Sequence, residues 1–175
     1  PRPCGRGPFS MQKLSQLLNQ PEYVHEAINH FPLIGLFVAI LFLGIALILR
    51  NRLTILLGLA LVGVLALSVW PVYHYGEAGY DRVLSMSDEP GQAYLHYHEE
   101  LAERWVFLYY VTAGIVGLGL LLAWKWPKTL TYSSFLAMVL ATASLVAGIF
   151  IAQAGGEIRH REFRVGPPPA VQEER

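Results

Sequence analysis

Four long apolar runs dominate the pattern of hydrophobic and polar positions along the chain. They cover residues 31–49, 53–72, 105–124 and 130–152, and none of them contains a charged residue. Each run holds about 20 residues, which is enough for a helix to cross the ~30 Å hydrocarbon core of a bilayer. The sequence therefore predicts an all-α fold, namely an integral membrane antiparallel four-helix bundle. The lipid bilayer is then one partner of the protein.

The connections between the runs predict how the chain lies in the membrane. Residues 50–52 (RNR) join the first two runs and residues 125–128 (KWPK) join the last two, so both turns are short, basic and free of acids. Short basic loops stay in the cytoplasm. We therefore expect a multi-pass protein of a bacterial inner (cytoplasmic) membrane with both termini and the long loop 73–104 on the extracytoplasmic side.

The ends of the chain differ from its middle in composition. Residues 166–175 form a Pro-rich tail, and residues 1–24 precede the four-helix transmembrane domain, which we place at 25–165. Within the N-terminal segment, residues 11–19 (MQKLSQLLN) carry apolar side chains at helical spacing, which predicts a short amphipathic helix. No small-residue cleavage pattern follows the first apolar run, so we expect that run to be a span and not a signal peptide.

Proline and composition add two further expectations. Pro71 lies near the end of the second run, where its missing N–H predicts a kink. The chain is 54% hydrophobic with a formal net charge of zero, and this balance does not suggest a nucleic-acid partner. A single cysteine, Cys4, excludes thiolate metal motifs of the C-x-x-C type.

All six histidines lie outside the apolar runs, and several have an acidic residue at helical spacing. Side chains three or four residues apart share one face of a helix, and Glu-x-x-His pairs on the helices of a bundle are the arrangement of carboxylate-bridged iron proteins. The pairs are Glu26 with His30, His74 with Glu77, His96 with Glu99, and Glu157 with His160. This pattern predicts a cluster of imidazoles and carboxylates at the extracytoplasmic end of the bundle.

Two kinds of cofactor fit such a cluster. Haem b needs two imidazoles at one depth on neighbouring helices, and His30 and His74 both fall within two residues of a span boundary. A non-haem transition metal (Fe, Cu or Zn) suits imidazole and carboxylate ligands, and the abundance of acids favours this variant. The candidate ligands for the metal are Glu77, His98, Glu99, Glu157 and His160.

Four segments occur in an order that resembles a family of bacterial membrane proteins. They are H-x-x-x-x-H-F-P-L (25–33), G-E-A (76–78), H-E-E-L-A (98–102) and A-G-G-E-I (154–158). The family has four spans, is known as a domain of unknown function, and opens with an HPxxVHFP-like motif. The resemblance covers residues 25–165 and implies the fold and topology but no settled activity.

The resemblance also points to particular residues. It implies functional importance for His30, Glu77, His98, Glu99 and Glu157. The sequence departs from the family in having Glu26 where a proline is usual and in carrying two extra histidines, His74 and His96.

Two functions remain open from the sequence. The first is a membrane redox or metal-binding subunit that works with other membrane or periplasmic redox subunits. The second is a cofactor-free accessory subunit of a larger membrane complex, because no nucleophile–base arrangement or phosphate loop marks a free-standing enzyme. We therefore expect the chain not to be an enzyme on its own.

Overall fold

The described part of the chain is built from helices alone. The computed structural model describes residues 11–170, with side chains from residue 14 on, and no strand occurs in that range. This confirms the prediction of an all-α fold. Residues 1–10 of the expected N-terminal segment, with Cys4, and residues 171–175 of the Pro-rich tail lie outside the described residues.

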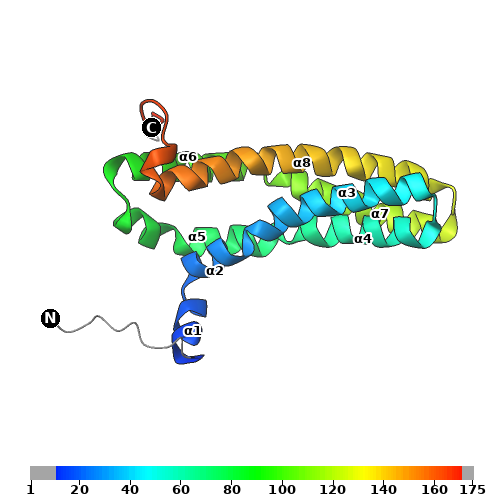
Figure 1. Ribbon diagram of the computed structural model, residues 1–175, viewed down its shortest axis with the longest axis horizontal. Coiled ribbons are helices and arrows are strands. Elements are labelled where there is room, and N and C mark those ends of the chain that lie inside the picture. Colours follow the sequence, from blue (N-terminus) through cyan, green and yellow to red (C-terminus); the bar gives the residue numbers. More distant parts are fainter. Residues whose placement is uncertain (1–10, 171–175) are drawn as a thin grey trace.

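Eight α-helices and two short helical segments follow one another along the described residues. In chain order they are α1 Met11–Leu18, α2 Pro21–Ile28, η1 Phe31–Gly35 (a π-helical turn), α3 Leu36–Leu49, α4 Arg52–Leu67, α5 Val69–Met86, α6 Glu89–Trp105, α7 Phe107–Lys125, α8 Thr129–Arg159 and η2 Arg161–Phe163. The short helix expected over residues 11–19 is α1, which projects away from the others beside α2 (Figure 1).

Most of these helices join end to end into four longer ones that lie side by side (Figure 1). They run over Pro21–Leu49, Arg52–Met86, Glu89–Lys125 and Thr129–Arg159, and each is long and apolar enough to cross a membrane. The second has 35 residues, or about 50 Å at 1.5 Å per residue. Since the hydrocarbon core is about 30 Å thick, the helices continue well beyond the apolar runs, as suits a multi-pass membrane protein.

The second long helix is interrupted at Ser68, within one turn before Pro71. Pro71 has no N–H to donate to the carbonyl of Leu67, four residues earlier. The regular helix stops at Leu67 and resumes at Val69, and the Ser68 hydroxyl donates to the Leu65 carbonyl at 2.6 Å. The predicted irregularity at Pro71 is therefore present.

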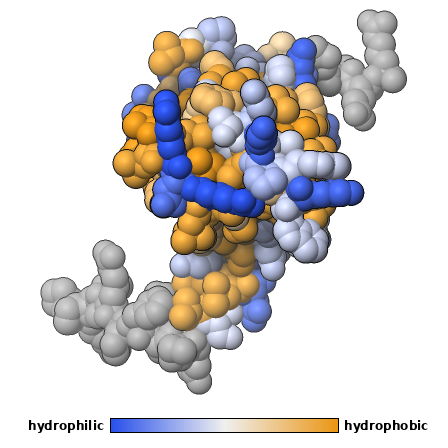
Figure 2. Space-filling view, turned by 90° about the vertical axis from the view of Figure 1, so that its right-hand side faces the viewer, coloured by the Kyte–Doolittle hydropathy of each residue, from blue (hydrophilic) through white to orange (hydrophobic). Residues whose placement is uncertain are grey.

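The two basic turns lie at one end of the long helices. Arg50 adopts a left-handed conformation (φ 54°), and the Asn51 side chain caps α4 by accepting from the N–H groups of Leu53 and Thr54. Arg52 donates to the carbonyl of Ala123 at the end of α7. Figure 2 shows this end, where a few strongly hydrophilic side chains stand on a largely hydrophobic surface.

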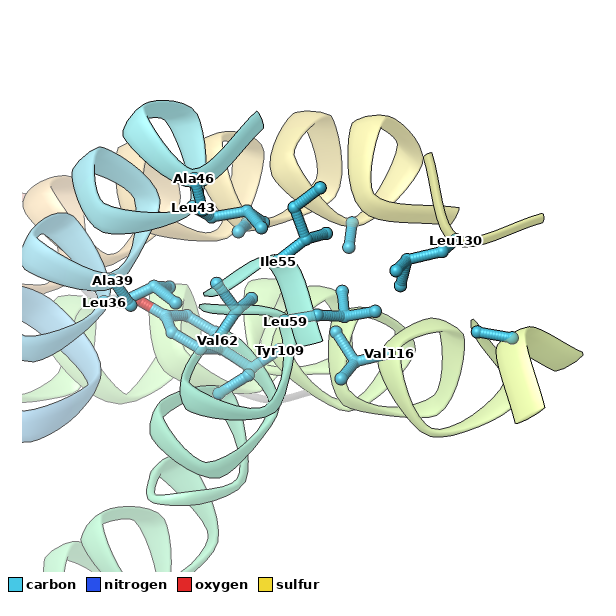
Figure 3. Packing of buried hydrophobic residues seen from close by; sticks show 14 of the residues in the cluster. Leu36, Ala39, Leu43, Ala46, Ile55, Leu59, Val62, Tyr109, Val116 and Leu130 are labelled. Carbon is cyan, nitrogen blue, oxygen red and sulfur yellow. The ribbon is translucent and has the colours of Figure 1, made fainter. Parts of the chain in front are cut away.

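A continuous apolar core lies between α3, α4, α7 and α8 (Figure 3). Leu36, Leu43, Leu59 and Val62 are fully buried in it. Large apolar side chains on the outer faces of the same helices stay exposed, as expected where lipid tails replace solvent. Leu57, for example, is 55% exposed and only two residues from Leu59.

We predict that Leu59→Ala and Leu57→Ala affect stability very differently. Removal of the buried Leu59 side chain leaves a cavity, for which losses of about 2 kcal/mol or more are typical. At Leu57, lipid or detergent fills the space, so the loss should be small. Thermal unfolding in a mild detergent measures both. Equal destabilisation by the two substitutions would contradict an outward-facing Leu57.

Candidate functional site

At the end opposite the basic turns, the helices separate into two pairs. There α2 packs along α5 and α6 packs along α8, whereas α5 and α6 touch each other little (Figure 1). A cavity of about 450 Å³ lies between the two pairs and is lined by side chains from all four of these helices.

Apolar layers bound this cavity below and above. Val69 and Tyr109, which also belong to the main core, line its lower part. At the outer end, Leu95 and Ile158 line it and belong to a second apolar cluster between α5, α6 and α8. The cavity is therefore a slot with α2 and α5 as one wall and α6 and α8 as the other.

His25 lies in the first wall and is fixed against the backbone of α5. Its Nδ1 lies 2.8 Å from the carbonyl oxygen of Val72. A carbonyl only accepts, so Nδ1 carries the proton and donates it. Gly76, one turn after Val72, permits this approach, because a Cβ at residue 76 would lie 3.0 Å from Nδ1.

His98 repeats this arrangement in the second wall. Its Nδ1 donates to the carbonyl of Ile151 on α8, also at 2.8 Å. Gly155 again lies four residues after the acceptor, and a Cβ there would come within 3.1 Å of the ring. Each wall thus holds one imidazole by a carbonyl and a glycine at i and i+4.

The two imidazoles face each other across the slot. The ring centroids of His25 and His98 are 6.3 Å apart and the ring planes are at 89°. With Nδ1 held against a helix, the Nε2 side of each ring is left to face the cavity, and neither Nε2 has a hydrogen-bond partner among the described residues. Each ring therefore keeps one nitrogen without a hydrogen-bond partner among the described residues, and both rings line the same cavity.

The histidines predicted as a haem pair are not placed together in this way. His30 is exposed and lines the cavity near its lower edge. His74 is outside the cavity lining and stacks on Trp70 with centroids 6.2 Å apart.

The residues predicted as non-haem metal ligands are distributed over different surroundings. His98, Glu99 and Glu77 line the cavity, and His160 lies at its rim with Nδ1 3.0 Å from the Glu162 carboxylate. Glu157 is buried but does not line the cavity. In residues 11–170, no group of three or more His, Cys, Asp or Glu side chains is arranged to hold a metal ion.

The two open edges of the slot differ in charge. At the edge between α5 and α6, the lining carries the acids Glu77 and Glu99 beside Tyr73. At the edge between α2 and α8, it carries Asn29 and Arg159, whose Nη1 is 3.9 Å from the Glu26 carboxylate. The first edge is thus acidic, whereas at the second edge a guanidinium balances the carboxylate of Glu26, which also lines the cavity.

A clamp outside the cavity fixes α6 against the end of α8. Arg164 forms a two-pronged ion pair with Asp88, with both N–O distances 2.9 Å, and also donates to the carbonyls of Glu157 and Ile158. Asp88 in turn caps the N-terminus of α6. The Arg164 guanidinium holds the pKa of the Asp88 carboxyl down at about 2, with a smaller contribution from Arg161.

Sequence reasoning missed His25 as a site residue. It has an acidic residue, Glu22, at i−3, but the predicted pair used His30, which lies nearer to the span boundary. One signal in the sequence pointed to it: His25 and His98 lie at similar distances beyond their spans. Gly76 and Gly155 follow the ends of the second and fourth apolar runs by four and three residues, but their role is visible only in the structure.

No model of a protein family matches the sequence, and no curated protein or solved structure is similar to it. The resemblance to the four-span membrane family stays a prediction, and the candidate site rests on its own geometry.

We predict that the Asp88–Arg164 clamp weakens in acid. A carboxyl whose pKa is lowered by folding stabilises the folded state fully above its ordinary pKa of 3.8 and loses that contribution as the pH falls toward about 2. Unfolding temperatures between pH 6 and pH 2 should therefore fall less steeply in Asp88→Asn than in the wild type. The exposed Glu100 on the same helix supplies the control, Glu100→Gln, which should keep the wild-type slope.

Proposed function

We propose that the chain is a redox subunit of a bacterial cytoplasmic membrane that holds a metal centre between His25 and His98. The observation that carries this proposal is the facing imidazole pair, with both Nδ1 atoms committed to backbone carbonyls.

The separation of the rings suits a single metal between them. A metal midway along the 6.3 Å between the centroids would lie about 3 Å from each centroid. An Nε2 that points along this line would then be about 2 Å from the metal, which is the usual length of a metal–imidazole bond. Without a metal or a donor between them, two unprotonated nitrogens would face each other at a cost in free energy.

The surroundings of the two rings also suit metal ligands. A histidine that binds a metal through one nitrogen usually donates its other N–H to a carbonyl or carboxylate, which fixes the tautomer and the ring orientation. Val72 and Ile151 supply these carbonyls for His25 and His98. Histidines that only cap a helix or pair with an acid have no need of this symmetrical arrangement.

Imidazole ligands suit iron and copper, which exchange electrons, as well as zinc, which does not. Structural zinc takes four protein ligands and catalytic zinc three, and the described residues offer no such group. Of the metals that two imidazoles can hold, we therefore favour a redox metal.

The membrane arrangement gives the centre a place in electron transfer. In the proposed antiparallel bundle, the basic residues Arg50, Arg52, Lys125 and Lys128 face the cytoplasm, and the cavity lies at the extracytoplasmic end. A centre there can take one electron from a membrane redox subunit and pass it to a periplasmic one, or the reverse.

We predict that His25→Ala and His98→Ala each reduce bound metal to a small fraction of the wild-type amount. The single imidazole that remains in each variant would hold a metal only weakly. Elemental analysis of protein purified in mild detergent measures the metal, and circular dichroism checks that the helices remain. His74→Ala and His96→Ala, which alter exposed histidines outside the pair, should keep the wild-type stoichiometry.

A folded wild-type protein that contains no metal after purification, and takes up none when metal salts or haem are added, would overturn the proposal. The cofactor-free accessory subunit would then be favoured, and the histidines of the slot would serve only to join the helices of each pair.

We predict that Gly76→Ala and Gly155→Ala also weaken metal binding, by at least several-fold. A methyl group 3.0–3.1 Å from ring atoms pushes the imidazole from its carbonyl and displaces Nε2. Competition with a chelator measures the affinity. Gly114→Ala and Gly117→Ala are matched controls, since a Cβ at either position would meet nothing within 4 Å. Unchanged affinity in all four variants would contradict the role of the two glycines.

A further inference from the structure

We infer that the cofactor between His25 and His98 is a non-covalently bound haem, an iron tetrapyrrole with one histidine on each face. This inference rests on the proposed function and names the class of its cofactor.

Two protein ligands are too few for iron or copper, so the cofactor itself must supply the remaining donor atoms. Iron and copper usually have four to six ligands, and the slot offers a pair of imidazoles from opposite walls. Glu77 and Glu99 line the α5/α6 edge but form no metal-binding group with the histidines. The cofactor must therefore bring its own equatorial donors, as a tetrapyrrole does.

The shape and lining of the cavity suit a flat, largely apolar disc. Its volume of about 450 Å³ is within the range of about 300–1,000 Å³ for sites that bury cofactor-sized ligands. Its lining includes the small residues Ala102, Ala152 and Gly156 and the larger apolar residues Leu33 and Val106. A disc that lies between the helix pairs would receive one imidazole from each wall, since His25 and His98 line the cavity from opposite sides.

The mode of attachment follows from the sequence. Covalent haem attachment uses a C-x-x-C-H motif, and the chain has one cysteine, Cys4, which no such motif contains. The haem is therefore held by its two axial histidines and by the walls of the slot.

The charge difference between the two edges orients the haem. Its propionates are anionic, so Glu77 and Glu99 repel them at the α5/α6 edge. At the α2/α8 edge, Arg159 balances the charge of Glu26 across a distance of 3.9 Å, and Arg159 and Asn29 can donate hydrogen bonds to the propionates. We therefore place the propionates at the α2/α8 edge.

Ligation on both faces limits the chemistry of the centre. An iron with two axial histidines has no free position for oxygen or another substrate, so it transfers electrons and does not activate a bound molecule. This agrees with the expectation that the chain is not an enzyme on its own.

The decisive experiment titrates detergent-purified, cofactor-free protein with ferric protoporphyrin IX. We expect one haem to bind per chain with a low-spin spectrum. We also expect the highly anisotropic low-spin EPR signal of iron whose two imidazole planes are perpendicular, as the rings are at 89°. The reduced form should not change on addition of carbon monoxide.

Variants assign the two ligands. His25→Ala and His98→Ala should each leave one axial position open, giving a high-spin spectrum and carbon monoxide binding. The double variant His74→Ala/His96→Ala, at exposed histidines outside the cavity lining, should keep the wild-type spectrum. Arg159→Ala should weaken haem binding several-fold, Arg159→Lys should restore part of it, and Arg104→Ala, at an exposed arginine of α6, should have no effect.

The possible failures are distinct. Stoichiometric binding of iron, copper or zinc salts without uptake of the porphyrin would overturn the haem inference and leave the metal centre in place. Haem bound with an unchanged spectrum in both His25→Ala and His98→Ala would also overturn it, because other residues would then be the ligands. Absence of both metal and haem binding would overturn the proposed function itself.

Discussion

The polar end of the protein is organised by one contact that occurs twice, an imidazole N–H donated to a helix carbonyl across a glycine. A helix carbonyl already accepts a bond from the N–H four residues later, and its second lone pair is usually shielded by the side chain of that residue. At Gly76 and Gly155 no side chain intervenes, so His25 and His98 reach the carbonyls of Val72 and Ile151 at 2.8 Å. Each contact joins two helices into a pair and fixes an imidazole in the lining of the cavity between the pairs.

This contact explains why the helices pack tightly at one end and separate at the other. In the main core, Leu59 and Val62 fill the space between neighbouring helices completely. Beyond Tyr109, the strongest packing is within each pair, and a cavity of about 450 Å³ lies between them. The cavity is open at two edges, so water or a ligand can enter a space of this size. The outer apolar cluster around Leu95 and Ile158 closes the far end, so the space is a defined slot and not a frayed end.

The sequence predicted the helices well because their signals are local and strong. Charge-free runs of about 20 residues, basic turns at 50–52 and 125–128, and Pro71 each act within a few residues of their own position. The continuation of the helices into the polar segments was less evident, since 73–86 and 89–104 mix charged and aromatic residues without a long apolar run. There Asp88 caps the N-terminus of α6, and its ion pair with Arg164 holds this end of the helix in place.

The pairing of histidines was beyond sequence reasoning for a physical reason. Depth counted from a span boundary tells which residues share a level, but the direction of a side chain depends on which helix lies opposite. His30 and His74 share a level, yet His74 stacks on Trp70 outside the slot. His25 and His98 also share a level, and they meet because α2 and α6 belong to different pairs. The deciding information is carried by Gly76 and Gly155, whose missing side chains matter only in relation to a ring on another helix. A site between helices therefore needs small residues at particular positions as well as ligands. A ligand side chain reaches its position only where the facing helix leaves room for it.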